Sequence, residues 1–244
     1  WPAIFLVFWW RSRQKVLHLE RAHAVEIAAL AAATLFSLTL PLKDSITLID
    51  TAILAALFIL YVWVIARAPS EEPELVGPAL FIGTLPRMQR RGAIIALFLA
   101  SAGSIFASAE PFAEGLVHTG TKLGIDEFVL VQWLAPFASE APEFLVAGIL
   151  AYRGRATVAM GALLSSKVNQ WTLLIGGLPI AYAVSGGHVE GLPLDLRQKE
   201  ELFLTAAQSY FALAVVMSLS LSGREAIALA VLFFLQFAIP VESI

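Results

Sequence analysis

Two glutamates lie three residues apart inside one of the most apolar stretches of the chain. Glu140 and Glu143 occur near the centre of the segment 126–152, in the run Pro136-Phe137-Ala138-Ser139-Glu140-Ala141-Pro142-Glu143. Side chains at this spacing share a helix face, so we expect both carboxylates to point the same way. Two neighbouring carboxylates suit a hard cation, which prefers oxygen ligands. They equally suit a bound proton, because like charges resist joint ionisation.

The prolines of this run indicate an irregular helix. Pro136 and Pro142 are six residues apart, and each removes a backbone donor. We therefore expect an opened helix with carbonyl oxygens free to bind a cation. Irregular backbone at this depth is tolerated only against protein or a water-filled cavity. The run predicts an ion pathway, whereas simple helix kinks are the structural alternative.

A second polar run lies within the apolar segment 156–184. It reads Ser165-Ser166-Lys167-Val168-Asn169-Gln170-Trp171-Thr172. Ser166 and Gln170 share one helix face, and Lys167 lies on the adjacent face. A charge at the bilayer centre costs about 2.5–3.5 kcal/mol or more, so we expect Lys167 to pair with Glu140 or Glu143. The alternative for the Ser, Asn and Gln side chains is ordinary hydrogen bonding between helices.

Other acidic residues are isolated or lie near segment ends. Glu110, followed by Pro111, lies near the outer end of the segment 92–117 and predicts a vestibule or a third proton-carrying site. Solvation explains Glu114 at the same end. Four further polar residues lie near span ends or occur singly within a span, and this favours structural roles for them: Glu26, Asp50, Gln208 and Glu225.

The composition identifies the environment in which these residues must lie. Of 244 residues, 59% are hydrophobic and 14% charged, and the mean hydropathy is +0.79. Soluble domains have roughly 45–50% apolar and about 25% charged residues, so this is an integral membrane protein. A net charge of −3 excludes a nucleic-acid binder that depends on a basic surface. The lack of cysteine excludes disulfides, thiolate metal sites and thiol nucleophiles.

The apolar segments predict an all-α, polytopic fold. Seven segments approach the roughly 20 residues that cross a bilayer: 24–41, 47–66, 92–117, 126–152, 156–184, 202–221 and 225–239. An apolar stub, 1–10, precedes them and predicts the tail of a further helix.

Lys and Arg distribute unequally between the two sides of this arrangement. Eleven fall on the side of the connections 11–23, 67–91 and 153–155, against four on the other, and Lys167 lies in neither set. Positive residues mark the cytoplasmic side, so we predict that these three connections are cytoplasmic, in the cytoplasmic membrane of a prokaryote. Four aromatic residues are predicted as interfacial anchors: Trp9, Trp10, Tyr61 and Trp63.

The first third of the chain resembles the last third. A shift of 177 positions pairs Pro2 with Pro179, Leu17 with Leu194, and Ala29 with Ala206; after a two-residue gap, Leu54 pairs with Leu229. The two copies begin from opposite sides of the membrane, which predicts inverted-topology repeats of five helices with a site near the midplane. Chance similarity in an intact seven-span chain is the alternative.

The repeat divides the chain into three parts. Residues 1–67 are predicted to be the last helices of the first repeat, and 68–91 a cytoplasmic linker with a short interfacial helix near 80–85. Residues 92–242 are predicted to be the complete second repeat, which carries the polar runs. We expect the missing first-repeat helices as partners, from the same protein or another chain.

At the two polar runs the chain resembles the calcium/cation exchanger superfamily. Ser139-Glu140-Ala141-Pro142-Glu143 is similar to its Gly-Thr-Ser-x-Pro-Glu motif, and the run from Ser165 is similar to its Gly-Ser-Asn motif. The resemblance implies that Glu143, Ser139, Ser166 and Gln170 bind a cation. Glu140 replaces a serine, and Lys167 replaces an asparagine. This places the ammonium where a monovalent cation would sit, as a counter-charge or proton carrier.

These observations predict a secondary antiporter that works by alternating access. It would exchange Ca²⁺ or another cation, such as Na⁺, for H⁺ or Na⁺ across the bilayer, with Glu143 and Glu140 as the metal ligands and no cofactor. The alternatives are an uncoupled, channel-like cation pathway or a non-transporting membrane subunit. An intramembrane enzyme that uses the two glutamates as acid and base is disfavoured, because the sequence has no His-Glu-x-x-His or Gly-x-Ser-x-Gly motif.

Overall fold

The computed structural model describes residues 1–68, 78–124, 135–186, 189 and 191–238, with only the backbone for 135–139 and 236–238. The chain is predominantly helical, as predicted, and divides into two compact units. The first unit consists of Trp1–Ala68 together with Pro142–Ile244, and the second of Pro69–Ala141. Helix α7 (Ala135–Tyr152) belongs to both, because the boundary falls between Ala141 and Pro142.

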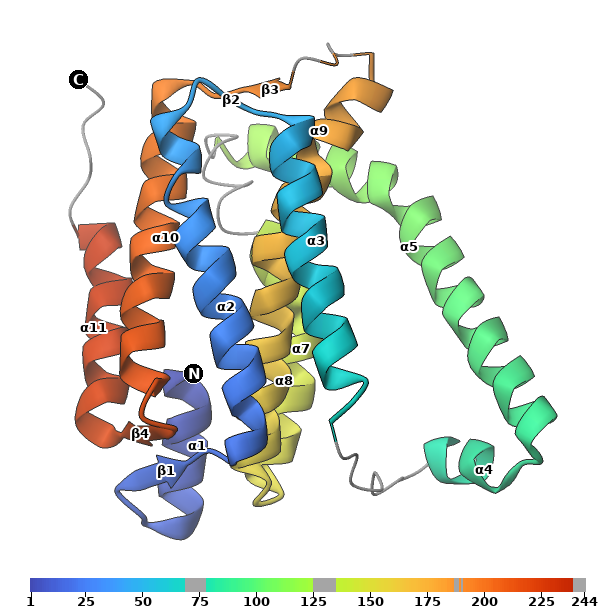
Figure 1. Cartoon of the computed structure of the whole chain (residues 1–244), viewed down its shortest axis with the longest axis vertical. Helices are drawn as coiled ribbons and strands as arrows, with labels where there is room; N and C mark the ends of the chain where they lie inside the picture. Colours follow the sequence, from blue (N-terminus) through green and yellow to red (C-terminus); the bar gives the residue numbers. More distant parts are fainter. Residues whose placement is uncertain (69–77, 125–134, 187–188, 190, 239–244) are drawn as a thin grey trace. The chain divides into compact units, whose positions relative to one another are not determined.

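The first unit is a bundle built around α2 (Figure 1). Helix α2 packs against α3, α8 and α10, and its Leu30, Ala33 and Thr34 side chains are fully buried. The helical elements of the unit, besides the end of α7, are α1 (Pro2–Ser12), α2 (Ala24–Ser37), α3 (Leu48–Ile65), α8 (Ala156–Asn169), a π-helical segment (Gln170–Leu174), α9 (Ile175–Val184), α10 (Leu196–Val216), α11 (Gly223–Ala238), and 3₁₀ turns at Arg21–His23 and Leu40–Leu42.

Two short antiparallel sheets tie the connections of the first unit together. Strand β1 (Val16–His18) pairs with β4 (Ser220–Ser222), and β2 (Ser45–Ile46) pairs with β3 (Leu192–Pro193). The β1–β4 sheet lies at one end of the helices and the β2–β3 sheet at the other (Figure 1). Each sheet therefore joins a connection of the first copy to a connection of the second.

The sequence repeat relates the two sheets to each other. The amide of Leu19 donates to the carbonyl of Leu219 at 2.8 Å, and the amide of Leu194 donates to that of Asp44 at 2.8 Å. A shift of 175 positions relates one bond to the other, because Leu19 then corresponds to Leu194 and Asp44 to Leu219. The predicted shift of 177 before the gap is therefore wrong at this point, since the register that pairs Leu54 with Leu229 already applies at Leu19. Because these equivalent bonds lie at opposite ends of the bundle, the inverted repeat is confirmed.

The same shift relates two helix caps. At α3 the Thr47 amide donates to the Asp50 carboxylate at 2.8 Å, and at α11 the Ser222 amide donates to the Glu225 carboxylate at 2.7 Å. In each case the hydroxyl of the first residue accepts from the amide of the second at 3.4 Å. Reciprocal bonds of this kind are capping boxes. They confirm the structural interpretation of Asp50 and Glu225.

The second unit contains α4 (Pro78–Thr84), α5 (Arg87–Leu123) and the first residues of α7. Helix α4 matches the short helix predicted near residues 80–85. Helix α5 is 37 residues long, and it extends beyond the predicted span 92–117 at both ends. Its end is set by Gly124, whose φ of +66° is a left-handed conformation that favours glycine.

Three of the described helical segments are long and apolar enough to cross a membrane: Arg21–Leu42, Leu48–Ile65 and Arg87–Leu123. The predicted span 156–184 is helical but contains the π segment. The predicted span 202–221 is shifted, because an Asp195–Gln198 capping box starts α10 at Leu196. Part of the predicted span 126–152 lies outside the described residues.

The cap of α3 predicts a measurable stability contribution. Asp50 is 1% exposed and also pairs with the Lys43 ammonium, which is 40% exposed. Replacing it with alanine, Asp50→Ala, removes the cap and the pair together. We expect a loss of about 1–2 kcal/mol in thermal unfolding of the detergent-solubilised protein. The control is Asp44→Ala, whose side chain is fully exposed and whose loss should be smaller; equal effects would contradict the assignment.

Candidate functional site

The acidic pair lies on α7, where a proline interrupts the helix. Glu140 is half-buried and Glu143 is exposed. Pro142, between them, has no N–H for the carbonyl of Ala138, so that oxygen lacks its helical donor. The backbone thus offers one oxygen beside the two carboxylates, and the side chain of Ser139 lies outside the described part of the chain.

Pro136 is the second residue of α7, and residues 125–134 before it lie outside the described part of the chain. The prediction that Pro136 opens the helix therefore stays a prediction. Pro142 lies inside α7.

The second polar run lies at the end of α8 and enters the π segment. Ser166 and Lys167 are half-buried residues of α8, and Gln170, also half-buried, is the first residue of the π segment. Glu143, Ser166 and Gln170 belong to the first unit, whereas Glu140 lies at the end of the second. The ion pair between Lys167 and a glutamate of α7 stays a prediction.

The π segment follows the polar run directly and is anchored by two hydrogen bonds. Trp171, 3% exposed, donates from Nε1 to Ser209 Oγ on α10 at 2.9 Å. Thr172, 1% exposed, donates from Oγ1 to the carbonyl of Val168 at 2.6 Å. Such widened turns concentrate at functional sites. The sequence analysis missed it; Pro179, which follows in α9, is the signal of an irregular helix.

A further anchor on α8 corrects one prediction. Tyr61 of α3 is 8% exposed, and its hydroxyl lies 2.9 Å from Ser165 Oγ. The prediction that Tyr61 is an interfacial anchor is therefore wrong, because its phenol packs between helices. Trp9 and Trp63 are exposed as predicted, and each lies under a guanidinium, of Arg13 at 5.1 Å and of Arg67 at 3.7 Å from the ring centroid.

Glu110 lies inside α5, which continues beyond residue 117, the predicted end of the span. It is an exposed residue of α5 in the second unit, 13 positions before the last residue, Leu123. At 1.5 Å per residue this is about 20 Å from the helix end. The polar residues after Val117 continue the helix, so Glu110 is not near its outer end. Its vestibule role stays a prediction.

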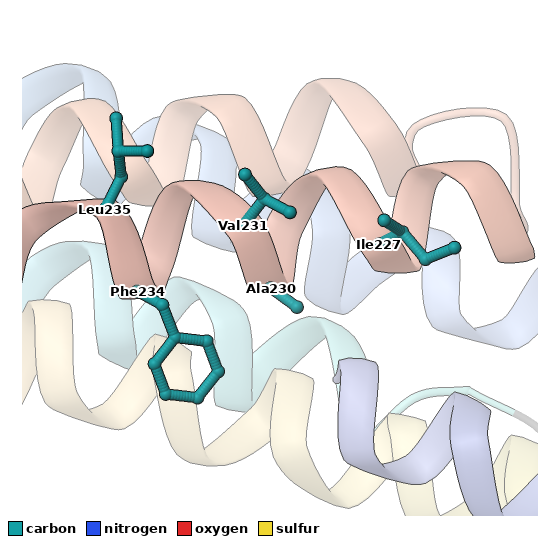
Figure 2. A pocket seen from close by; sticks show the side chains of 5 residues that line it. All are labelled: Ile227, Ala230, Val231, Phe234 and Leu235. Carbon is teal, nitrogen blue, oxygen red and sulfur yellow. The ribbon is translucent and has the colours of Figure 1, made fainter.

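The remaining features of the described residues offer no alternative metal centre. Within that part of the chain no three His, Cys, Asp or Glu residues gather into a metal-binding group. A cation site would need hydroxyl, amide and carbonyl oxygens besides the carboxylates. A hollow on α11 provides none, since only apolar side chains line it (Figure 2): Ile227, Ala230, Val231, Phe234 and Leu235.

The anchor of the π segment predicts an energetic coupling between α10 and the π turn. Trp171→Phe leaves the buried Ser209 hydroxyl without its donor, and Ser209→Ala leaves the indole N–H without its acceptor. Each is expected to cost about 1–3 kcal/mol in thermal unfolding, and the double variant less than their sum. Additive losses would show that the bond contributes nothing of its own.

Comparison with known proteins places this arrangement in context. Against curated proteins the chain has no match. Among solved structures, one described as the H⁺/Ca²⁺ exchanger CAX has a TM-score of 0.91 and 42% identity, covering 98% of this chain and 62% of that one. The chain thus spans less than two thirds of that relative's length.

Two structures of the sodium–calcium exchanger NCX_Mj, soaked with Na⁺ and Sr²⁺, have TM-scores of 0.58 and 0.59 at 18% and 19% identity. Each match covers 97% of this chain and 72% of the other, and at this identity it shows the fold alone. The family model described as "Sodium/calcium exchanger protein" matches residues 93–241, which is more than half of the chain and all of the predicted second repeat except its first and last residues. The chain belongs to the sodium/calcium exchanger family.

Proposed function

We propose that the chain is part of an antiporter that exchanges Ca²⁺ for H⁺ by alternating access at a site between α7 and α8. The observation that carries this proposal is the 42% identity, over 98% of the chain, with the structure described as an H⁺/Ca²⁺ exchanger. Membership of an exchanger family supports transport rather than enzymatic catalysis. In this proposal the end of the bundle with β1 and β4 faces the cytoplasm of a prokaryote.

The ligands follow from the chemistry of the two polar runs. In this proposal Ca²⁺ binds oxygen atoms, the ligands that it prefers. They come from Glu143, Glu140 and Ser139 on α7, from Ser166 on α8 and from Gln170 at the start of the π segment. The carbonyl freed by Pro142 supplies one more. Cation and proton exclude each other, because a protonated carboxylate no longer attracts the cation. This exclusion couples the two fluxes.

Lys167 is the counter-charge of the site in this proposal. Its ammonium neutralises one carboxylate when the cation is absent, and thereby stabilises the empty site in the low-dielectric interior. A fixed ammonium also occupies the place of a monovalent cation, which favours H⁺ over Na⁺ as the coupling ion.

The inverted repeat supports alternating access. Helices α2 and α3 of the first copy have their counterparts in α10 and α11, and the equivalent sheets close opposite ends of the bundle. Two halves of similar structure and opposite orientation exchange conformations to open a midplane site to either side. The helices that complete the first repeat would come from the same protein or another chain.

The direct test is transport by the full-length protein in proteoliposomes. We expect an imposed pH gradient to drive Ca²⁺ uptake, and Glu143→Gln to reduce that uptake at least tenfold, because it removes a carboxylate ligand. The matched control is Glu225→Gln, which alters a carboxylate engaged in a helix cap. If Glu143→Gln transports like the unmodified protein, the site assignment is wrong.

The coupling ion is tested in the same vesicles. A Na⁺ gradient of equal size, imposed at constant pH, is expected to drive little Ca²⁺ uptake. Uptake driven equally by Na⁺ would contradict H⁺ coupling, and Ca²⁺ flux that ignores both gradients would identify an uncoupled pathway.

A further inference from the structure

A histidine and a glutamate form an enclosed pair at the start of α2, away from both polar runs. His23 precedes the helix and Glu26 lies in its first turn. Their side chains are each only 14% exposed, and His23 Nδ1 lies 3.7 Å from Glu26 Oε1. The pair belongs entirely to the first unit, at the end of the bundle with β1 and β4.

The imidazole lies directly on the backbone of α8. A Cβ added at Gly161 would stand 2.2 Å from His23 Cε1, so only glycine leaves room for the ring. One turn earlier on α8, Thr157 donates from Oγ1 to the carbonyl of His18 on β1 at 3.3 Å. The ring therefore lies between the start of α2 and the backbone of α8, where its charge affects how the two helices pack.

The pair is incompletely hydrogen-bonded. In the described part of the chain, neither His23 Nδ1 nor Glu26 Oε2 has a hydrogen-bond partner, although both atoms are buried. The distance of 3.7 Å between His23 Nδ1 and Glu26 Oε1 is too long for a hydrogen bond but lies within the range of an ion pair. The geometry leaves one acceptor position on the imidazole, and a proton bound there faces a carboxylate.

The charges around the pair favour that proton. Glu20 on the preceding connection and Glu26 itself are acidic, and the Glu26 carboxylate also acts electrostatically on the Tyr61 phenol of α3. Helix α8 contributes Gly161 and Thr157. With a neutral imidazole the enclosed pair carries the net charge of the carboxylate. With a protonated imidazole its net charge is zero, which costs less in an interior of low dielectric constant.

At the opposite end of the bundle, the described residues at the equivalent position hold a different charged pair. There Lys199 Nζ lies 2.7 Å from Asp44 Oδ1, and the Asp44 side chain is fully exposed. The Lys199 ammonium holds the pKa of the Asp44 carboxyl below its usual range, so this pair keeps its charges throughout the neutral range. Of these two pairs, only that of His23 has a group that ordinarily titrates between about pH 5 and 8.

We propose that His23 and Glu26 form a proton-binding site at the β1–β4 end of the bundle, whose occupancy sets how tightly α2 packs on α8. Gly161 lies five residues before Ser166, about 7.5 Å along the helix. Resting on the proposed function, the consequence is that the exchanger responds to pH on this side through α8, separately from proton binding at the carboxylates of α7.

Proton binding is tested first without transport, on the full-length protein in detergent. We expect the thermal midpoint to fall as the pH rises from about 5.5 to 8, because the protonated imidazole stabilises the packed pair and is lost over this range. His23→Gln and Glu26→Gln should each at least halve this slope. The matched control is His18→Gln, which alters an exposed histidine on β1 and should leave the slope unchanged.

A measurement on the intact pair covers the case in which these variants fail to fold. In protein labelled with ¹³C at histidine Cε1, with His18, His118, His188 and every histidine outside residues 1–244 replaced by glutamine, the remaining signal belongs to His23. We expect it to titrate between about pH 5 and 8. A signal that does not move over this range, or a stability slope equal in His23→Gln and His18→Gln, would overturn the proposal.

Transport then tests the consequence. In oriented vesicles at saturating Ca²⁺, a pH change on the β1–β4 side alone should alter the rate at least twofold in the unmodified protein but not in Glu26→Gln. A titrating His23 in a protein without Ca²⁺/H⁺ exchange would contradict the proposed function and leave the proton site intact. Ca²⁺/H⁺ exchange by a protein whose His23 signal does not titrate would contradict the proton site and leave the proposed function intact.

Discussion

Polar groups within the bundle depend on partners in the protein, since lipid offers no hydrogen bonds. The short sheets, the caps and the side-chain anchors all follow from this constraint. The β1–β4 and β2–β3 sheets provide hydrogen-bond partners for backbone groups of the connections. Side chains that would otherwise expose polarity to lipid, such as Trp171 and Tyr61, find hydroxyl partners on neighbouring helices.

The same constraint explains why the inverted repeat persists in detail. A cap such as Thr47–Asp50 satisfies amides at a helix start, and the equivalent helix start in the other copy requires the same solution, provided by Ser222–Glu225. The bonds from Leu19 and Leu194 to the opposite copy obey the same exchange. These equivalent hydrogen bonds all lie at the element ends, where backbone groups need partners.

Two irregular elements accompany the polar runs. The π segment widens the helix at Gln170, and Pro142 interrupts α7 between its two glutamates. The two ends of the bundle also differ in charge: one has the enclosed His23–Glu26 pair, and the other has the Lys199–Asp44 pair, whose carboxylate is fully exposed. The inverted repeat therefore relates the backbone of the two ends but not their charged side chains.

The sequence by itself determined the membrane environment, the helical class, the repeat and the two polar runs, because apolar content, periodic segments and costly buried charges are local properties of the chain. It also indicated the structural roles of Asp50 and Glu225. It misjudged Tyr61, because the partner of a phenol depends on how neighbouring helices pack. It also ended the helix that contains Glu110 too early, because polar residues continue α5 beyond residue 117.

Only the tertiary structure decided which side chains meet across helices. The Trp171–Ser209 and Tyr61–Ser165 contacts join residues 38 and 104 positions apart, and no spacing rule predicts them. The glycine that admits the His23 ring lies on α8, far from the histidine in the chain. Long-range packing makes these pairs, because a side chain's partner is set by how helices cross and not by the residues beside it.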